Sequence, residues 1–86
     1  MNYTIYRISN KQNQTIHIGS FAETSNCSLK SLKNAYLKKL NIVNRDDYDV
    51  RQIIFTEFDR WVDVLDCKDM CRSVFEYVDP YLNPAN

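Results

Sequence analysis

The side chains best suited to chemistry are few, and they lie far apart in the sequence. The chain has one histidine, His17, and three cysteines, Cys27, Cys67 and Cys71. Three cysteines cannot all pair within one chain, and none has the CxxC spacing of a zinc ribbon near a histidine. We therefore expect no disulfide and no zinc site. The cysteines are interpreted as free or buried thiols of a cytoplasmic protein, with Cys67 and Cys71 on one face of a helix.

A polar row at helical spacing is the second chemical feature. Lys30, Asn34 and Lys38 recur at i, i+4 and i+8, so they share one side of a helix. Lysine ammonium groups and an asparagine amide at this spacing can contact phosphate. The alternative interpretation is a helix face that is simply solvated.

Charge is divided unevenly along a chain whose formal net charge is zero. Residues 1–45 carry seven basic residues and one acid, and residues 46–86 carry four basic residues and ten acids. Such an asymmetry can orient a protein on a polyanion or on a partner of mixed sign. Alternatively, the two halves attract each other and their fields cancel.

The first twenty residues predict a β-hairpin. Residues 3–8 are β-branched or aromatic at nearly every position, and residues 15–20 alternate again after a polar loop. Side chains alternate between the faces of a strand, so Thr4, Tyr6 and Ile8 should share one face, opposite Tyr3 and Ile5. In the second strand the same rule groups Thr15, His17 and Gly19, opposite Ile16 and Ile18.

The rest of the chain predicts a helix, a strand and a closing helix. Cap chemistry at residues 24–26 precedes a helix over residues 28–42, whose apolar stripe is Leu29, Leu32, Tyr36, Leu40 and Val43. Residues 50–65 fit both a strand and a helix; we assign a strand at 50–58, followed by a connection through a buried Trp61. The capping-box spacing of Asp66 and Asp69 predicts a last helix from Cys67 to Val78, ended by Pro80 and Pro84.

Length and composition favour one small domain over residues 1–86. The chain is 44% hydrophobic and 13% aromatic, enough for a modest core. No apolar run approaches the roughly 18 residues that span a bilayer, so a membrane protein is disfavoured.

The stretch Thr4-Ile5-Tyr6, followed by His17-Ile18-Gly19, resembles the start of GIY-YIG endonuclease domains. That family carries Gly-Ile-Tyr on one strand and Tyr-Ile-Gly on the next. Its intervening Lys-Ile-Thr-Asn-Lys-like run is echoed here by residues 7–11, and Pro80-Tyr81-Leu82-Asn83 looks like the Pro-x-x-Asn close of many members. The resemblance implies an α+β fold, a three-stranded antiparallel sheet flanked by helices in the order β-β-α-β-α. This implication decides the assignment of residues 50–58 to a strand.

The resemblance also implies a set of site residues. Members cut nucleic-acid phosphodiesters with one divalent metal held by a helix glutamate, a tyrosine beside the attacking water, and an arginine and often a histidine on the first helix. By position, Tyr6 matches the first tyrosine, His17 replaces the second, Lys30 stands for the arginine and Asn34 for the histidine. The glutamate position falls on Cys71, and a thiol is a poor ligand for Mg²⁺. Glu76, Asp69 or Asp66 could substitute if the last helix has slipped. Five basic residues are candidates for nucleic-acid contact: Arg7, Lys11, Lys30, Lys33 and Lys38.

Each of these residues also has a structural interpretation. Tyr6 and His17 fit a cross-strand pair on a half-buried sheet face. Gly19 fits a conformational role at the end of a strand, and Cys71 fits a buried position at a seam with Val74 and Val78.

The sequence therefore predicts a GIY-YIG-like domain with an eroded nuclease site, which binds nucleic acid or a protein partner without efficient cleavage. One alternative is an active endonuclease that uses His17, a displaced carboxylate and Mg²⁺ or Mn²⁺. The other is a virus- or phage-encoded accessory protein that inhibits a host defence factor by protein binding.

Overall fold

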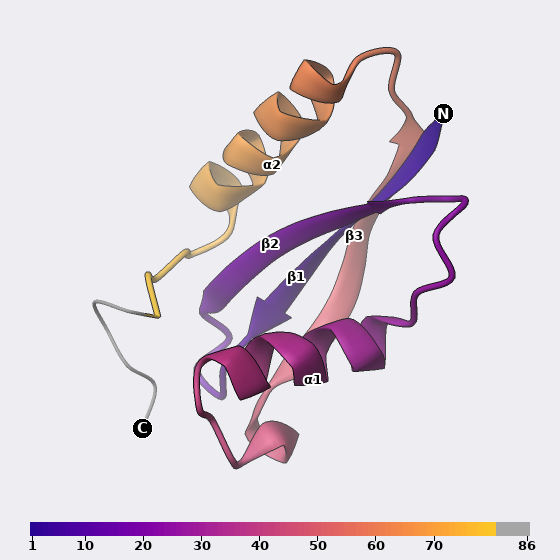
Figure 1. Cartoon of the computed structure of the whole chain (residues 1–86). Helices are drawn as coiled ribbons and strands as arrows, with labels where there is room; N and C mark the ends of the chain where they lie inside the picture. The colour runs from indigo at the N-terminus through magenta and orange to yellow at the C-terminus, as the bar shows by residue number, and fades with distance from the viewer. Residues whose placement is uncertain (81–86) are drawn as a thin grey trace.

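A three-stranded antiparallel sheet and two helices make up the fold, which is α+β (Figure 1). The computed structural model describes residues 1–80. Within them the elements are β1 (Asn2–Ser9), β2 (Thr15–Ala22), α1 (Leu29–Lys39), the 3₁₀ turn η1 (Arg45–Asp47), β3 (Asp49–Glu57) and α2 (Trp61–Val74). The strand order is β2-β1-β3, so the first strand is the central one. The predicted fold class and the order β-β-α-β-α are confirmed, including the strand in the ambiguous stretch.

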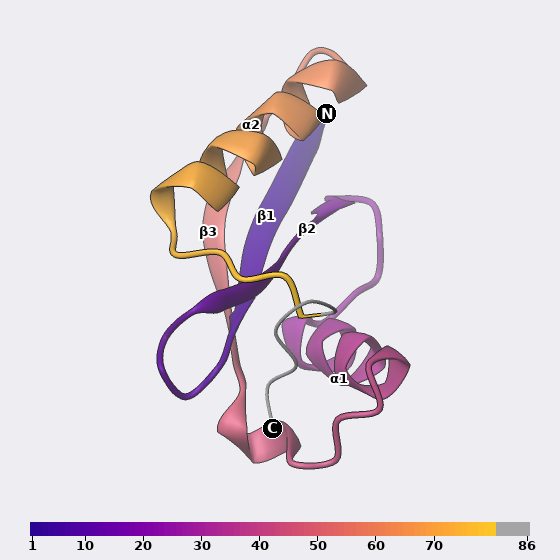
Figure 2. The same cartoon turned by 90° about the vertical axis from the view of Figure 1, so that its left-hand side faces the viewer.

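The two helices cover opposite faces of the sheet, as the two views in Figures 1 and 2 agree. Side chains of β1 alternate between the two cores, as the period-two rule predicts. Tyr6 and Ile8 pack with Leu37 on the α1 side. Ile5 packs with Cys71 on the α2 side. Each helix therefore closes its own small core, and β1 contributes to both.

A bulge in β2 changes the predicted pattern of its side chains. The pairing of β1 with β2 shifts register after Ile8 and leaves Ile16 as an extra residue. Ile16 joins the core under α1. Thr15 instead turns to the α2 side, where its Oγ1 accepts a hydrogen bond of 2.9 Å from Arg7 Nε. The prediction that Thr15 shares a face with His17 is therefore wrong, because the extra residue reverses the alternation.

Helix α1 starts where the sequence predicts it, but another residue caps it. The Ser28 side chain accepts a hydrogen bond of 3.1 Å from the Ser31 backbone N–H, so the cap is Ser28 and not residues 24–26. The helix ends at Lys39, before the predicted Ile42. Leu37, outside the predicted stripe, is fully buried, whereas Val43 is exposed. A helix that lies flat on a sheet buries a wider face than a narrow stripe.

Helix α2 begins six residues earlier than predicted. It starts at Trp61, so Asp66 and Asp69 lie in its interior and cap nothing. Trp61 is 54% exposed and is not a core residue. The start was missed because the N-cap residue, Arg60, makes no capping hydrogen bond with its side chain. The helix ends at Val74, before Pro80; residues 81–84 of the predicted close lie outside the described residues.

The chain after α2 runs along the free edge of β2. The Thr15 backbone N–H donates to the Glu76 carbonyl at 2.7 Å, and the Val78 N–H donates to the Thr15 carbonyl at 2.8 Å. These bonds form a one-residue parallel bridge between Thr15 and Tyr77. Val78 then packs against the core under α1. The segment from Glu76 to Val78 thus crosses from the α2 side of the sheet to the α1 side.

Candidate functional site

Tyr6 and His17 lie in an aromatic cluster between the sheet and α1. The Tyr6 ring meets the His17 ring edge-on at 5.9 Å between centroids, and His17 stacks on Tyr36 of α1 at 4.1 Å. Tyr6 also contacts Phe21 of β2 at 6.1 Å. In the sheet register Tyr6 is opposite Gly19, so Tyr6 and His17 are diagonal neighbours and not a direct cross-strand pair. The structure brings these two predicted residues together, in a packed setting.

Burial weakens both groups as acids and bases near neutral pH. Burial, followed by the charge of Cys27, raises the pKa of the Tyr6 hydroxyl. Burial lowers the pKa of His17 to about 4, helped by the positive charges of Lys68, Arg72 and Lys39. A general base is most effective when its pKa lies near the operating pH. His17 is neutral at pH 7, but it holds a proton too weakly to be an efficient base.

Gly19 makes room for Tyr6. It lies in the middle of β2, and its φ angle is not positive, so the predicted role at a strand end is wrong. A Cβ atom built on Gly19 would overlap Cζ and Oη of Tyr6. The ring of Tyr6 therefore lies directly over the glycine, and any side chain at position 19 would displace it.

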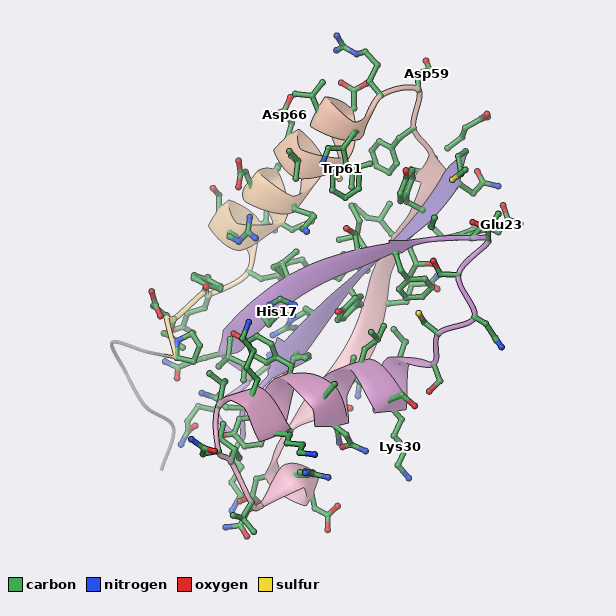
Figure 3. All side chains as sticks on the ribbon, viewed as in Figure 1. His17, Glu23, Lys30, Asp59, Trp61 and Asp66 are labelled. Carbon is green, nitrogen blue, oxygen red and sulfur yellow. The ribbon has the colours of Figure 1, made fainter. Side chains whose placement is uncertain are left out.

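Lys30 and Asn34 of α1, which the sequence predicts to complete this site, differ in where they lie. Lys30 is exposed and extends from α1 away from the sheet, whereas His17 lies between β2 and α1 (Figure 3). Asn34, one turn further along α1, is half-buried. The ammonium group of Lys30 is thus separated from the Tyr6–His17 pair by the body of the helix.

Cys71, the residue at the metal-ligand position, lies on the other face of the sheet. It is buried, as predicted, but against Ile5 and Ile18. The predicted seam with Val74 and Val78 is wrong, since Val74 is exposed and Val78 packs against the core under α1. Burial, followed by the neighbouring thiol of Cys67, raises the pKa of Cys71, so it stays protonated at pH 7. A protonated thiol in an apolar setting is not a ligand for a hard cation.

The three carboxylates that could replace the metal-binding glutamate lie apart from one another. Glu76 is exposed beyond the end of α2, where its Oε1 accepts a hydrogen bond of 3.3 Å from Gln14. Asp69 is paired with Arg72 at 2.7 Å, and Asp66 lies on the exposed side of α2. Within residues 1–80, no group of three His, Cys, Asp or Glu side chains is placed to hold a metal ion.

Three of the predicted nucleic-acid contacts are used inside the molecule. Arg7 donates to Thr15 Oγ1 and, at 2.9 Å, to the Asn13 carbonyl, and its guanidinium lies 4.8 Å from the centre of the Phe75 ring. Lys11 forms an ion pair of 3.2 Å with Asp47. Lys33 donates to the carbonyl of Tyr48 at 3.0 Å and to that of Arg45 at 3.3 Å. These cations join the hairpin and α1 to the rest of the fold.

Two further cations lie near Lys38 that sequence reasoning did not select. Lys39 follows it in the last turn of α1, and Arg45 lies across an open depression of about 420 Å³ beyond the end of that helix. The depression is lined by Lys38, Asn41, Ile42, Val43 and Arg45. In the sequence, the adjacent pair Lys38-Lys39 is the feature that could have indicated this cluster of positive charge.

No family model, curated protein or solved structure matches this chain. None of the helices formed by residues 1–80 is long and apolar enough to cross a bilayer.

Proposed function

We propose that this chain is a GIY-YIG-like protein that binds nucleic acid through α1 and does not cleave it efficiently. The observation that carries the proposal is the charge of α1, which has four lysines and no acid. Lys33 is used internally, but Lys30, Lys38 and Lys39 are exposed and make no ion pair within the described residues. These three exposed ammonium groups suit contact with phosphate oxygens.

The acids of α2 support this assignment because they lie away from α1. The acids of α2 are on the opposite side of the sheet from α1: Asp63, Asp66 and Asp69. Local pairs absorb part of their charge, with Arg60 holding Asp63 and Arg72 holding Asp69. Asp46 and Asp47 in η1 bound the lysines of α1 at one end, and Asp47 is held by Lys11. The acids of α2 therefore do not lie against the lysines of α1, and a polyanion can approach these lysines from the side of α1 that faces away from the sheet.

The surroundings of the resembling residues favour binding without cleavage. Tyr6 and His17 are packed against aromatic rings, and Cys71 is on the far side of the sheet from both. Phosphodiester cleavage needs a metal or another cation at the developing charge and a base near the attacking water. The exposed face of α1 carries small and polar residues beside its lysines, so we infer contacts with the backbone and little sequence preference.

Binding is tested with fluorescently labelled single- and double-stranded DNA of 20 nucleotides, by anisotropy over a series of salt concentrations. Each phosphate contact with duplex DNA contributes a slope of about −0.9 in log K against log salt, so three lysines predict a slope of about −3. The variant Lys30→Glu/Lys38→Glu should lose at least tenfold in affinity. Its charge-matched control, Arg51→Glu/Arg60→Glu, changes exposed cations away from α1 and should bind within twofold of the wild type. Equal losses in both variants would refute a site on α1.

Cleavage is tested on the same DNA with Mg²⁺ or Mn²⁺, and we expect none. Metal-dependent cleavage that disappears in Tyr6→Phe would instead support the active endonuclease. We further propose a cytoplasmic location, which suits three cysteines that are all free thiols. The accessory-protein alternative needs a surface that binds protein, and α2 carries a candidate.

A further inference from the structure

The N-terminal part of α2 exposes apolar side chains that the core does not use. Trp61 is 54% exposed, Val62 45% and Leu65 41%. The same helix contacts the sheet through other positions, and its buried residues are Val64 and Cys71. Folding therefore does not account for the exposed parts of these three apolar side chains. Gathered within five residues, they form a patch, and exposed patches of this kind mark binding surfaces.

The Trp61 ring of the patch is held in place by packing against β1. The Trp61 ring lies 5.8 Å from that of Tyr3 in β1, and Tyr3 in turn meets Phe58 at 6.1 Å. The indole is thus packed on one side and open on the other. An anchored aromatic ring loses little conformational entropy on binding, which is why tryptophan is frequent among the residues that dominate binding energy.

The rim of the patch is acidic. Asp59 lies on the loop that precedes α2, and Asp66 follows Val62 by one turn on the upper side of the helix, whereas the Trp61 ring lies below the helix toward the sheet (Figure 3). Arg60, between Asp59 and Trp61, is paired with Asp63 at 2.9 Å. Neither forms an ion pair within residues 1–80, and both are exposed. This rim repels the phosphates of nucleic acid and attracts a cationic partner. Lys68, further along the helix, limits the surface at its other end.

We infer that Trp61, Val62 and Leu65 form a docking surface for a short, positively charged amphipathic helix of a partner protein. Side chains spaced by four residues form a ridge on a helix, and Trp61 and Leu65 form such a ridge here. A partner helix with leucines at i, i+3, i+4 and i+7 would pack against it. Its flanking lysines or arginines would then lie near Asp59 and Asp66.

A second copy of this chain matches the surface less well. The basic helix α1 buries its leucines against its own sheet. Its outer side presents Ser31, Ala35 and lysines, which offer charge but no large apolar residue for Trp61. An amphipathic cationic helix meets the apolar and the charged requirements of the surface together.

The single tryptophan of the chain, Trp61, reports directly on this surface. The probe is a synthetic 14-residue helical peptide with leucines at the spacing above and lysines on both flanks. One control peptide carries glutamate in place of lysine, and the other carries serine in place of leucine. We expect the cationic amphipathic peptide to shift the emission of Trp61 to shorter wavelength, saturably, with a Kd at least tenfold below those of both controls. Similar affinity for either control peptide, or no shift, overturns the inference.

Variants of the protein locate the site. Leu65→Ser and Asp66→Asn should each weaken the peptide at least fivefold, whereas Met70→Ser and Asp46→Asn, the matched controls away from the patch, should change it less than twofold. Circular dichroism melts confirm that each variant is folded, and Asp66→Asn replaces an exposed side chain, so it keeps the test informative if Leu65→Ser unfolds. Unchanged affinity in Asp66→Asn, or concentration-dependent dimerisation that shifts the Trp61 emission without peptide, contradicts the proposal.

This inference does not depend on nucleic-acid binding by α1. The variant Lys30→Glu/Lys38→Glu should retain peptide binding while losing DNA. A labelled DNA that shifts the Trp61 emission would contradict the assignment of this surface to a protein partner.

Discussion

Acidification should destabilise this protein through one residue, His17. Its pKa is about 4 in the folded state against 6.5 for an unperturbed histidine, because burial and the positive charges of Lys68, Arg72 and Lys39 oppose a proton on the ring. The folded state therefore prefers the neutral ring. The stability that this preference contributes is complete above pH 6.5 and is lost as the pH falls from 6.5 toward 4.

The magnitude follows from the two pKa values. Between pH 7.5 and pH 5.0 the unfolded chain takes up a proton at His17 while the folded protein takes up little, which costs about 2 kcal/mol of unfolding free energy. The ceiling at lower pH is about 3 kcal/mol. The carboxyl group of Asp49 also contributes, since its hydrogen bond from Arg51 lowers its pKa below 3.8; that contribution is lost at lower pH, outside this window.

Urea unfolding at pH 7.5 and pH 5.0 measures this effect, with Trp61 fluorescence as the signal. The control variant is His17→Gln, which cannot take a proton; it should be less stable than the wild type at pH 7.5 and should lose much less between the two pH values. Because the chain has a single histidine, NMR titration of its ring gives the pKa directly. A measured pKa near 6.5, or equal pH-dependent losses in wild type and variant, would refute the reasoning.

Three further substitutions test the packing. Gly19→Ala should lower the free energy of urea unfolding by about 2 kcal/mol because the new methyl group displaces the Tyr6 ring. The loss should be smaller in a Tyr6→Leu background, and an equal loss in that background would contradict the close approach of the two residues. Ser28→Ala should cost about 1 kcal/mol and reduce helicity by circular dichroism, since it removes the cap of α1. Cys71→Glu should cost about 3 kcal/mol or more at pH 7, because it buries a carboxylate in an apolar core, and should produce no Mn²⁺-dependent cleavage; a stable variant that cuts DNA would contradict the placement of Cys71 away from the Tyr6–His17 pair.

The predictable parts of the fold were those with a local cause. Alternation along residues 3–8 reflects a strand with two buried faces, and it indicated correctly which residues share each core. The start of α2 had no such cause: Arg60 caps nothing with its side chain, whereas Asp66 and Asp69 imitate a cap inside the helix. No feature of the sequence indicates the bulge at Ile16 either. This bulge alone places Thr15 on the α2 side of the sheet, opposite the face predicted for it.

The candidate site was harder to predict because it depends on which face each helix covers. The spacing of Tyr6, Gly19 and His17 placed them near one another, and the structure adds the reason for the glycine, the ring that lies over it. No periodicity indicates that Cys71 belongs to the opposite core, since that depends on how the chain crosses the sheet after β3. Nor does periodicity identify which lysines are engaged; Lys33 and Lys38 look alike in sequence, yet the first is bonded to two carbonyls.

Because β1 is the central strand, its two edges are paired at different times during synthesis of the chain. The hairpin with β2 can form as soon as Ala22 is available, but the other edge of β1 waits for β3, whose first residue is Asp49. Thirty-nine residues, 10–48, separate Ser9 from Asp49, so at synthesis rates of about 5–20 residues per second that edge stays unpaired for about 2–8 s. During this interval a nascent hairpin offers its backbone to any neighbouring strand, including one from a chain on the next ribosome. Synthesis that is slow over residues 10–48 should therefore increase aggregation of a protein whose finished form pairs both edges of that strand.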